Sequence, residues 1–256
     1  MQNPVGAVQV TRRDGEQYFF TEDMQGSADA LLLEGMLLRT GPDGSVDLKF
    51  QTGIAMRVGA STGLRMTRSQ IVSDDAQSRV LVDLVQGRLM TRTETLTADS
   101  EIVVRTPTAV ASVRGTEFAV IEEELNQLLV NEGQVDVADE TGTVEETVTE
   151  GNRAEVDPEG QVELTELSEE DQEVLDELSD GLEYLDPEGA AQIDSIIETY
   201  EDARTNMEES VQQQIQANRE MFEQETQRMR NEFEQQREEI QGGVRDQLDR
   251  IRSGGQ

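Results

Sequence analysis

The chain has 256 residues, of which 35% are apolar and only 4% aromatic, with no Trp. This is little apolar surface for one globule of this length, so we expect a packed core in only part of the chain. The formal net charge is −34, and residues 121–200 hold most of it, with 27 acidic side chains against a single Arg. Such a block repels phosphate backbones, so we expect no nucleic-acid partner. We interpret the block as a solvated connector, although it could also attract cations or basic proteins.

Residues 5–167 show the pattern of a β-domain. Apolar and polar residues alternate in Val46–Phe50 and again in Ile54–Val58, which is typical of half-buried strands. The denser apolar run Val80–Val85 is predicted to be a strand buried on both faces. Turn signals rich in Gly, Pro and Asp separate these and further short apolar runs. The segment is therefore predicted to be all-β.

A weak internal repeat runs through this segment. Each copy places a glycine between two short apolar stretches, at Gly87, at Gly133 and, more loosely, at Gly151. Glycine adopts positive φ at little steric cost, so each strand can turn or bulge there. The repeat predicts stacked β-arches, arranged either like a solenoid or as a sandwich.

The pattern changes at Ser168, which is a candidate N-cap with Asp171 at the capping-box position. Apolar residues at helical spacing follow, so residues 168–186 are predicted to form a short acidic helix and connector, with Gly181 as a soft point. Asp186 and the following proline then signal a second helix start.

Residues 187–252 are predicted to form one long amphipathic helix, followed by a disordered tail at 253–256. The apolar or small residues of its stripe recur with a mean spacing of 3.63 residues, close to the period of a straight α-helix. A partner helix could cover this stripe as in a coiled coil, but the spacing predicts little left-handed supercoiling, and polar residues interrupt the seam. The candidate interface residues are Ile193, Ile196, Tyr200, Met207, Val211, Ile215, Phe222, Met229, Phe233 and Ile240.

One segment carries a recognisable signature. Residues Thr106–Val120 read TPTAVASVRGTEFAV, which resembles the hallmark of the FecR domain family. Downstream, EGQVDV at Glu132–Val137 resembles the family's glycine turn. Three upstream segments resemble further family elements in the same order, and together they extend the resemblance over about residues 30–157: Glu34–Thr40, Ser45–Phe50 and Gln86–Leu89.

The resemblance implies an extracytoplasmic, β-rich module. In the namesake proteins this domain lies in the periplasm and relays the state of an outer-membrane iron–chelate receptor to a sigma factor. That circuit uses a cytoplasmic helical segment and a membrane span, and this sequence shows neither. A sensor of this type would therefore act through a separate membrane partner.

The signature residues have two interpretations. Arg114 could bind a carboxylate or a phosphate. Alternatively, Gly115 makes a tight bend in which Arg114 and Thr116 satisfy backbone groups, and we favour this structural role. The signature residues interpreted in this way are Thr106, Pro107, Val113, Arg114, Gly115, Thr116, Phe118 and Gly133.

The chain has no His and no Cys, which excludes disulfides and removes the usual general bases and strong nucleophiles. It also lacks a P-loop, a dinucleotide fingerprint and an EF-hand loop. We therefore expect a non-enzymatic protein with no catalytic residue and no cofactor. The acidic pairs Asp74-Asp75 and Asp139-Glu140, and the turn Asp157–Glu159, could bind calcium weakly, although such turns are usually just solvated.

No run approaches the roughly 20 apolar residues needed to span a bilayer, and the chain does not open on an apolar signal core. Together with the resemblance, this predicts an extracytoplasmic location, in the periplasm or at the cell surface, with the signal peptide absent from this chain. A cytoplasmic location is the alternative.

Two functions follow. The first is an interaction or scaffold protein of the bacterial envelope, in which the β-domain docks a protein partner and the long helix is an assembly arm that can bind a second copy. The second is a periplasmic sensor or signal relay of FecR type. Neighbouring genes for a sigma factor and an outer-membrane receptor would favour the second. A membrane-surface role for the helix ranks lower, because its polar face carries nearly as many acids as arginines.

Overall fold

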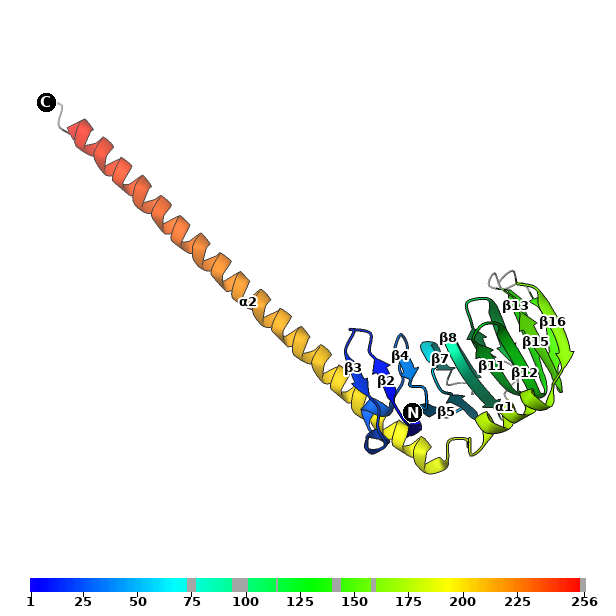
Figure 1. Ribbon diagram of the computed structural model, residues 1–256. Helices are drawn as coiled ribbons and strands as arrows, with labels where there is room; N and C mark the ends of the chain where they lie inside the picture. The colour runs from blue at the N-terminus through cyan, green and yellow to red at the C-terminus, as the bar shows by residue number, and fades with distance from the viewer. Residues whose placement is uncertain (73–76, 94–100, 114, 140–143, 158–159, 254–256) are drawn as a thin grey trace. The chain divides into compact units, whose positions relative to one another are not determined.

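The computed structural model describes residues 1–72, 77–93, 101–113, 115–139, 144–157 and 160–253. Within these residues it contains sixteen β-strands, two short 3-10 helices, Glu22–Met24 and Ala28–Ala30, and two α-helices. An all-β domain is followed by a long helix, as the sequence predicts (Figure 1). The chain divides into two compact units, Met1–Ile196 and Ile197–Gln256, so the long helix begins in the first unit.

Sheet A is entirely antiparallel and runs in the order β1, β5, β6, β8, β11, β12, β15, β16. Only the C-terminal part of β8 belongs to it. Its strands are β1 (Gln2–Val5), β5 (Ser45–Phe50), β6 (Ile54–Val58), β8 (Gln77–Thr93), β11 (Glu117–Glu122), β12 (Asn126–Glu132), β15 (Asn152–Val156) and β16 (Val162–Glu166).

Sheet B runs in the order β3, β2, β4, β7, β8, β9, β10, β13, β14 and includes the N-terminal part of β8. The β8–β9 pair is parallel. Its other strands are β2 (Val8–Thr11), β3 (Gln17–Phe19), β4 (Leu37–Thr40), β7 (Gly63–Val72), β9 (Glu101–Arg105), β10 (Ala109–Val113), β13 (Gln134–Asp139) and β14 (Val144–Thr149).

The repeated glycines lie where the chain passes from one sheet to the other. Strand β8 changes sheets at Gly87, whose φ is +95°, and a Cβ there would lie 2.3 Å from Thr62 Oγ1. Gly133 lies between β12 of sheet A and β13 of sheet B, and Gly151 lies between β14 of sheet B and β15 of sheet A. The predicted β-arches are confirmed, and they stack so that two sheets face each other.

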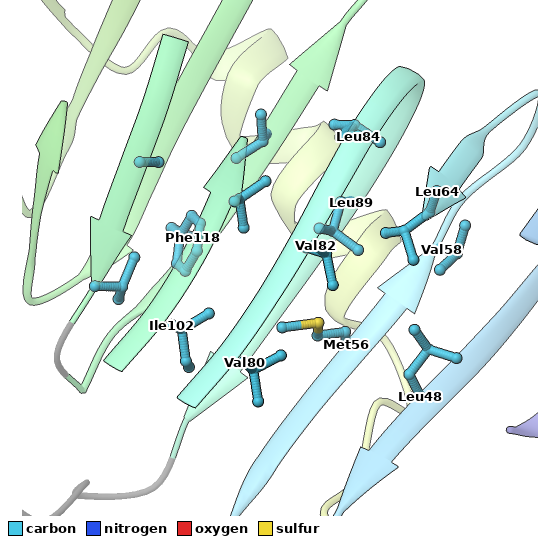
Figure 2. Close-up of a cluster of buried hydrophobic side chains, with 14 of the residues drawn as sticks. Leu48, Met56, Val58, Leu64, Val80, Val82, Leu84, Leu89, Ile102 and Phe118 are labelled. Atoms are coloured by element: carbon cyan, nitrogen blue, oxygen red, sulfur yellow. The ribbon is translucent and has the colours of Figure 1, made fainter. Parts of the chain in front are cut away.

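One apolar core fills the space between the two sheets. Residues that alternate along the strands point inward, and each buried large side chain contributes about 1.5–3 kcal/mol to the stability of the fold. Figure 2 shows this cluster, in which side chains of sheet A lie beside those of sheet B: Leu48, Met56, Leu89 and Phe118 with Leu64, Val80, Val82, Leu84 and Ile102.

The prediction that Val80–Val85 is buried on both faces is wrong. Val80, Val82 and Leu84 are buried in the core, but Leu81 is only half-buried and Val85 is 51% exposed. The outward side of this strand belongs to the outer face of sheet B, whereas the residue of β8 that packs with α1 is Met90, in the part of the strand that belongs to sheet A. A continuous apolar run therefore does not require cover on both sides.

Helix α1 (Glu169–Ser179) starts with a complete capping box. The Ser168 side chain accepts a hydrogen bond from the Asp171 N–H, and the Asp171 carboxylate accepts one from the Ser168 N–H. The helix ends earlier than the apolar stripe suggests, because Gly181 takes a left-handed conformation with φ +65°, which stops helices.

Helix α2 (Pro187–Ser253) has 67 residues and a length of about 100 Å at 1.5 Å per residue. Asp186 caps it, since the Gly189 N–H donates to Asp186 Oδ1 at 2.6 Å. Its first residues contact the β-domain, where Gln51 Nε2 donates to Asp194 Oδ1 at 2.7 Å. Neither helix has, among its described residues, an apolar stretch long enough to cross a bilayer.

Candidate interaction surfaces

The FecR-like signature lies mainly at the passages between the sheets. Gly115 has φ +81° and connects β10 of sheet B to β11 of sheet A. A Cβ on Gly133, whose φ is +86°, would lie 3.0 Å from the Gly115 carbonyl oxygen and 2.5 Å from Thr116 Cγ2. The Thr116 N–H donates to Thr93 Oγ1 at 2.7 Å, which ties this passage to the end of β8. The two glycines thus let two crossings pack against each other.

The start of the signature forms the turn between β9 and β10. Thr106 Oγ1 accepts hydrogen bonds from the Ala109 N–H at 3.0 Å and from Asn126 Nδ2 at 2.6 Å. Pro107 is exposed in this turn. Asn126 begins β12, so its buried side chain links the ends of the two sheets.

The remaining signature residues do not form a site with these. Val113 and Phe118 are buried in the core. Arg114, the candidate ligand-binding residue, lies outside the described residues. The described signature residues therefore lie at the crossings between the sheets, in the β9–β10 turn and in the core. They do not converge on a cavity.

Helix α1 covers part of the outer face of sheet A. This packing was not predicted from the sequence. Its Leu175 and Leu178, together with Leu182 beyond its end, are buried against outward-facing apolar residues of the sheet. These residues come from β6, β8, β11 and β12: Ala55, Met90, Ala119, Ile121 and Leu129. Part of sheet A is thus buried on both faces.

Two arginines of sheet A hold the C-terminal end of α1. Arg57 pairs with the buried Asp47 through both carboxylate oxygens, at 2.8 and 3.1 Å, and donates to the Leu178 and Asp180 carbonyls. Arg92 Nε donates to Glu117 at 2.7 Å and its Nη1 donates to the Leu182 carbonyl at 2.7 Å.

The Leu178 and Asp180 carbonyls lie at the helix end, which leaves such groups without intrahelical partners, and cations stabilise them. The Leu182 carbonyl belongs to the segment that follows the helix. The hydrogen bond to Glu117 is the largest cause of the raised pKa of the Arg92 guanidinium.

A third arginine holds the N-terminal end of α1. Arg153 Nη1 lies 3.3 Å from Asp171 Oδ1, and its Nη2 donates to Glu155 at 2.6 Å. Burial by itself would raise the pKa of Asp171. Hydrogen bonds from the Ser168 N–H and hydroxyl, with the charge of Arg153, outweigh burial and lower that pKa.

The outer face of sheet B is open and rich in arginine. Exposed arginines alternate with buried core residues along its central strands: Arg39 on β4, Arg65 and Arg68 on β7, Arg79 on β8 and Arg105 on β9. Strand register places Arg65 and Arg105 on either side of Asp83, and Arg105 Nε lies 3.8 Å from Asp83 Oδ1. Among the described residues this is the one ion pair found for these five arginines. We call this surface the arginine face.

The candidate interface on α2 divides into two parts. Ile193 and Ile196 are half-buried in the first unit. The stripe beyond them is exposed, with exposed fractions from 52% to 71%, at Met207, Val211, Ile215, Phe222, Met229 and Phe233. The side chains of Tyr200 and Ile240 lie outside the described part of the chain.

No group of three or more carboxylates among the described residues is placed to hold a metal ion. Asp74-Asp75, Glu140 and Pro158-Glu159 lie outside the described residues, so weak calcium binding by these loops stays a prediction. Asp157 is engaged in its own turn, where its Oδ1 accepts a hydrogen bond from the Gln161 N–H at 2.8 Å.

Comparison with known proteins agrees with the signature. Residues 36–136 match the family model described as FecR protein. The match extends from just before β4 into β13, so it includes strands of both sheets but neither helix. No curated protein matches the chain.

Two crystal structures of a "putative anti-sigma factor" from Parabacteroides distasonis, at 1.65 and 2.50 Å resolution, are similar to part of the chain. Each has 20% sequence identity and a TM-score of 0.42, and the match covers 51% of this chain. The chain spans about three fifths, 59%, of that protein's chain.

Proposed function

We propose that this chain, which carries a FecR domain at residues 36–136, is a non-enzymatic regulatory protein of FecR type that acts outside the cytoplasm. In this role the β-domain binds a signalling protein and passes the signal on through a separate membrane partner. The family match supports this proposal, because it covers the strands that build the common core of both sheets. It favours signalling over the scaffold role that we ranked first from the sequence.

The arginine face supports the proposal as the docking surface. Helix α1 covers the outer face of sheet A over its four central strands, whereas the arginines on the outer face of sheet B are exposed. Guanidinium groups bind carboxylates in a bidentate geometry and are enriched at protein interfaces. The half-buried Leu81 and the exposed Val85 lie on the same side of the sheet and add apolar contact. The partner that fits this surface is a protein segment rich in Asp and Glu.

The test is made in the source bacterium with the full chain. Deletion of the gene is expected to change transcription of a defined set of genes, as measured by RNA sequencing. Complementation with the wild-type chain restores the pattern, but the double variant Arg39→Glu/Arg65→Glu does not. The control, Arg13→Glu/Arg88→Glu, makes the same charge change outside the arginine face and restores it.

Unchanged transcription in the deletion strain would contradict the signalling function. If deletion changes transcription but both double variants restore it, the signalling function is supported. The proposal that the arginine face is the docking surface is then wrong. Circular dichroism of the purified variants checks that each retains the β-domain.

The scaffold role is kept as the second candidate because of one observation, the exposed apolar stripe on α2. A soluble monomer rarely leaves a row of large apolar side chains this exposed, so α2 is suited to assembly. A deletion strain with altered envelope integrity and unaltered transcription would favour this role.

A further inference from the structure

From Val211 to Phe233 the exposed stripe of α2 is symmetric about Phe222, whereas the position that matches Met207 on the other side is Arg237. The helix midpoint is residue 220, and Phe222, the most exposed member of the stripe at 71%, lies beside it. Ile215 and Met229 lie seven residues on either side of Phe222, and Val211 and Phe233 lie eleven residues on either side.

The two polar residues of the seam nearest Phe222 follow the same symmetry, whereas the third, Gln236, lies outside the symmetric part. Asn218 and Thr226 each lie four residues from Phe222. If a second helix crosses antiparallel at Phe222, every apolar residue of the stripe from Val211 to Phe233 meets an apolar residue, and each Asn218 meets a Thr226. Polar pairs inside an apolar seam fix the register of paired helices.

The charge along the chain distinguishes the two possible directions of pairing. Residues 187–209, at the start of α2, carry seven acidic side chains and one Arg, whereas residues 233–253 carry five acidic side chains and four Arg. The stretch 121–186, directly before the helix, adds 24 acidic side chains against one Arg.

A parallel pair would bring two such acidic stretches together. An antiparallel pair separates them by about the helix length of 100 Å, many times the Debye length of about 8 Å in physiological salt. It also places the most acidic part of one helix beside the arginine-richer end of the other.

We propose that α2 pairs with α2 of a second copy of this chain, antiparallel and crossing at Phe222. The interface is then two-fold symmetric, as in most dimers of identical chains. Pairing also gives the helix the apolar cover that it lacks alone, since helical stability in water comes mostly from packing of an apolar face. This inference does not depend on the FecR-type function, because it needs no other partner.

The lack of cysteine makes the direction directly measurable. Spin labels are attached to the full chain carrying Asn218→Cys or Gln236→Cys, both at polar positions of the seam, and electron–electron distances are measured between copies. Antiparallel pairing predicts about 15 Å for Asn218→Cys and about 45 Å for Gln236→Cys. Equally short distances at both positions mean parallel pairing and would overturn the proposal.

A charge-matched pair of variants tests the seam itself. Phe222→Glu places a charge in the seam, and Gln224→Glu makes the same charge change on the opposite side of the helix. Sedimentation equilibrium is expected to show a dimer for the wild type and for Gln224→Glu. The dissociation constant of the dimer should be at least tenfold larger for Phe222→Glu. A wild-type mass that stays monomeric at every concentration, or equal effects of the two variants, would contradict the proposal.

Discussion

Both α-helices that the structure describes carry an apolar stripe, but only the stripe of α1 is covered by other parts of the fold. In α1, Leu175 is 1% exposed, because the outer face of sheet A offers apolar side chains from four strands. In α2, Phe222 is 71% exposed within a helix six times as long. An amphipathic pattern thus identifies the face that needs cover, but the cover itself depends on a complementary surface elsewhere in the fold or in another molecule.

The largest expected difference between the helices is the loss of unfolding free energy when an apolar side chain of each is shortened to alanine. Leu175→Ala should lower the free energy of unfolding of the β-domain by about 3 kcal/mol, because it leaves a cavity between α1 and sheet A. Met207→Ala on α2 should change it by no more than about 0.5 kcal/mol. Urea unfolding followed by tyrosine fluorescence measures both, since Tyr18 and Tyr184 lie in the first unit. Equal effects would show that α1 is not part of the domain core.

The arginine contacts of α1 give the next largest effect. Arg92→Ala removes hydrogen bonds to Glu117 and to the Leu182 carbonyl and should cost about 2 kcal/mol of unfolding free energy. Arg228→Ala on α2 is the control, because its ion pair with Glu232, at 3.9 Å, is exposed on both sides. Exposed pairs contribute about 0–1 kcal/mol. A loss for Arg228→Ala as large as that for Arg92→Ala would show that the contact of Arg92 with the Leu182 carbonyl does not stabilise the docking of α1.

The N-cap of α1 is expected to contribute less. Ser168→Ala removes the hydrogen bond that Ser168 Oγ accepts from the Asp171 N–H and should cost about 1 kcal/mol of unfolding free energy, measured by urea unfolding at neutral pH. Ser168→Asn restores an oxygen acceptor without placing a second charge beside the Asp171 carboxylate, and it should recover part of the loss. A Ser168→Asn variant no more stable than Ser168→Ala would show that capping is not the cause.

The pH dependence of α1 docking provides a finer test. The pKa of Asp171 is lowered in the folded protein, so its carboxylate stabilises the fold above the unfolded pKa of about 4, and this contribution is lost as pH falls through the folded pKa. Urea midpoints at a series of pH values below about 5 should therefore fall less steeply in Asp171→Asn than in the wild type. Identical slopes would show that Asp171 titrates alike in both states.

Much of the fold could be predicted from the sequence because the relevant signals are local. The alternation in Val46–Phe50 and Ile54–Val58 identifies strands, and the repeated glycines identify the crossings between the sheets. The caps at Ser168 and Asp186 are likewise set by neighbouring residues.

The cover of each strand could not be predicted in this way. The apolar runs Val80–Val85 and Phe118–Ile121 look alike in sequence, yet only the second is covered on both faces, by a helix about 50 residues later in the chain. The role of Arg57 was hidden for the same reason, since two of its acceptors are backbone carbonyls more than 100 residues away, and any residue type could supply them.

Hydrogen–deuterium exchange along the full chain, measured at several protein concentrations, tests most directly whether the two helices differ as described. We expect α1 amides to exchange as slowly as those of β11 and β12 at every concentration, because α1 opens only with the domain. Amides of α2 between residues 203 and 237 should exchange much faster at low concentration and gain protection as concentration rises and copies pair. Fast exchange of α1, or protection of α2 that does not depend on concentration, would contradict it.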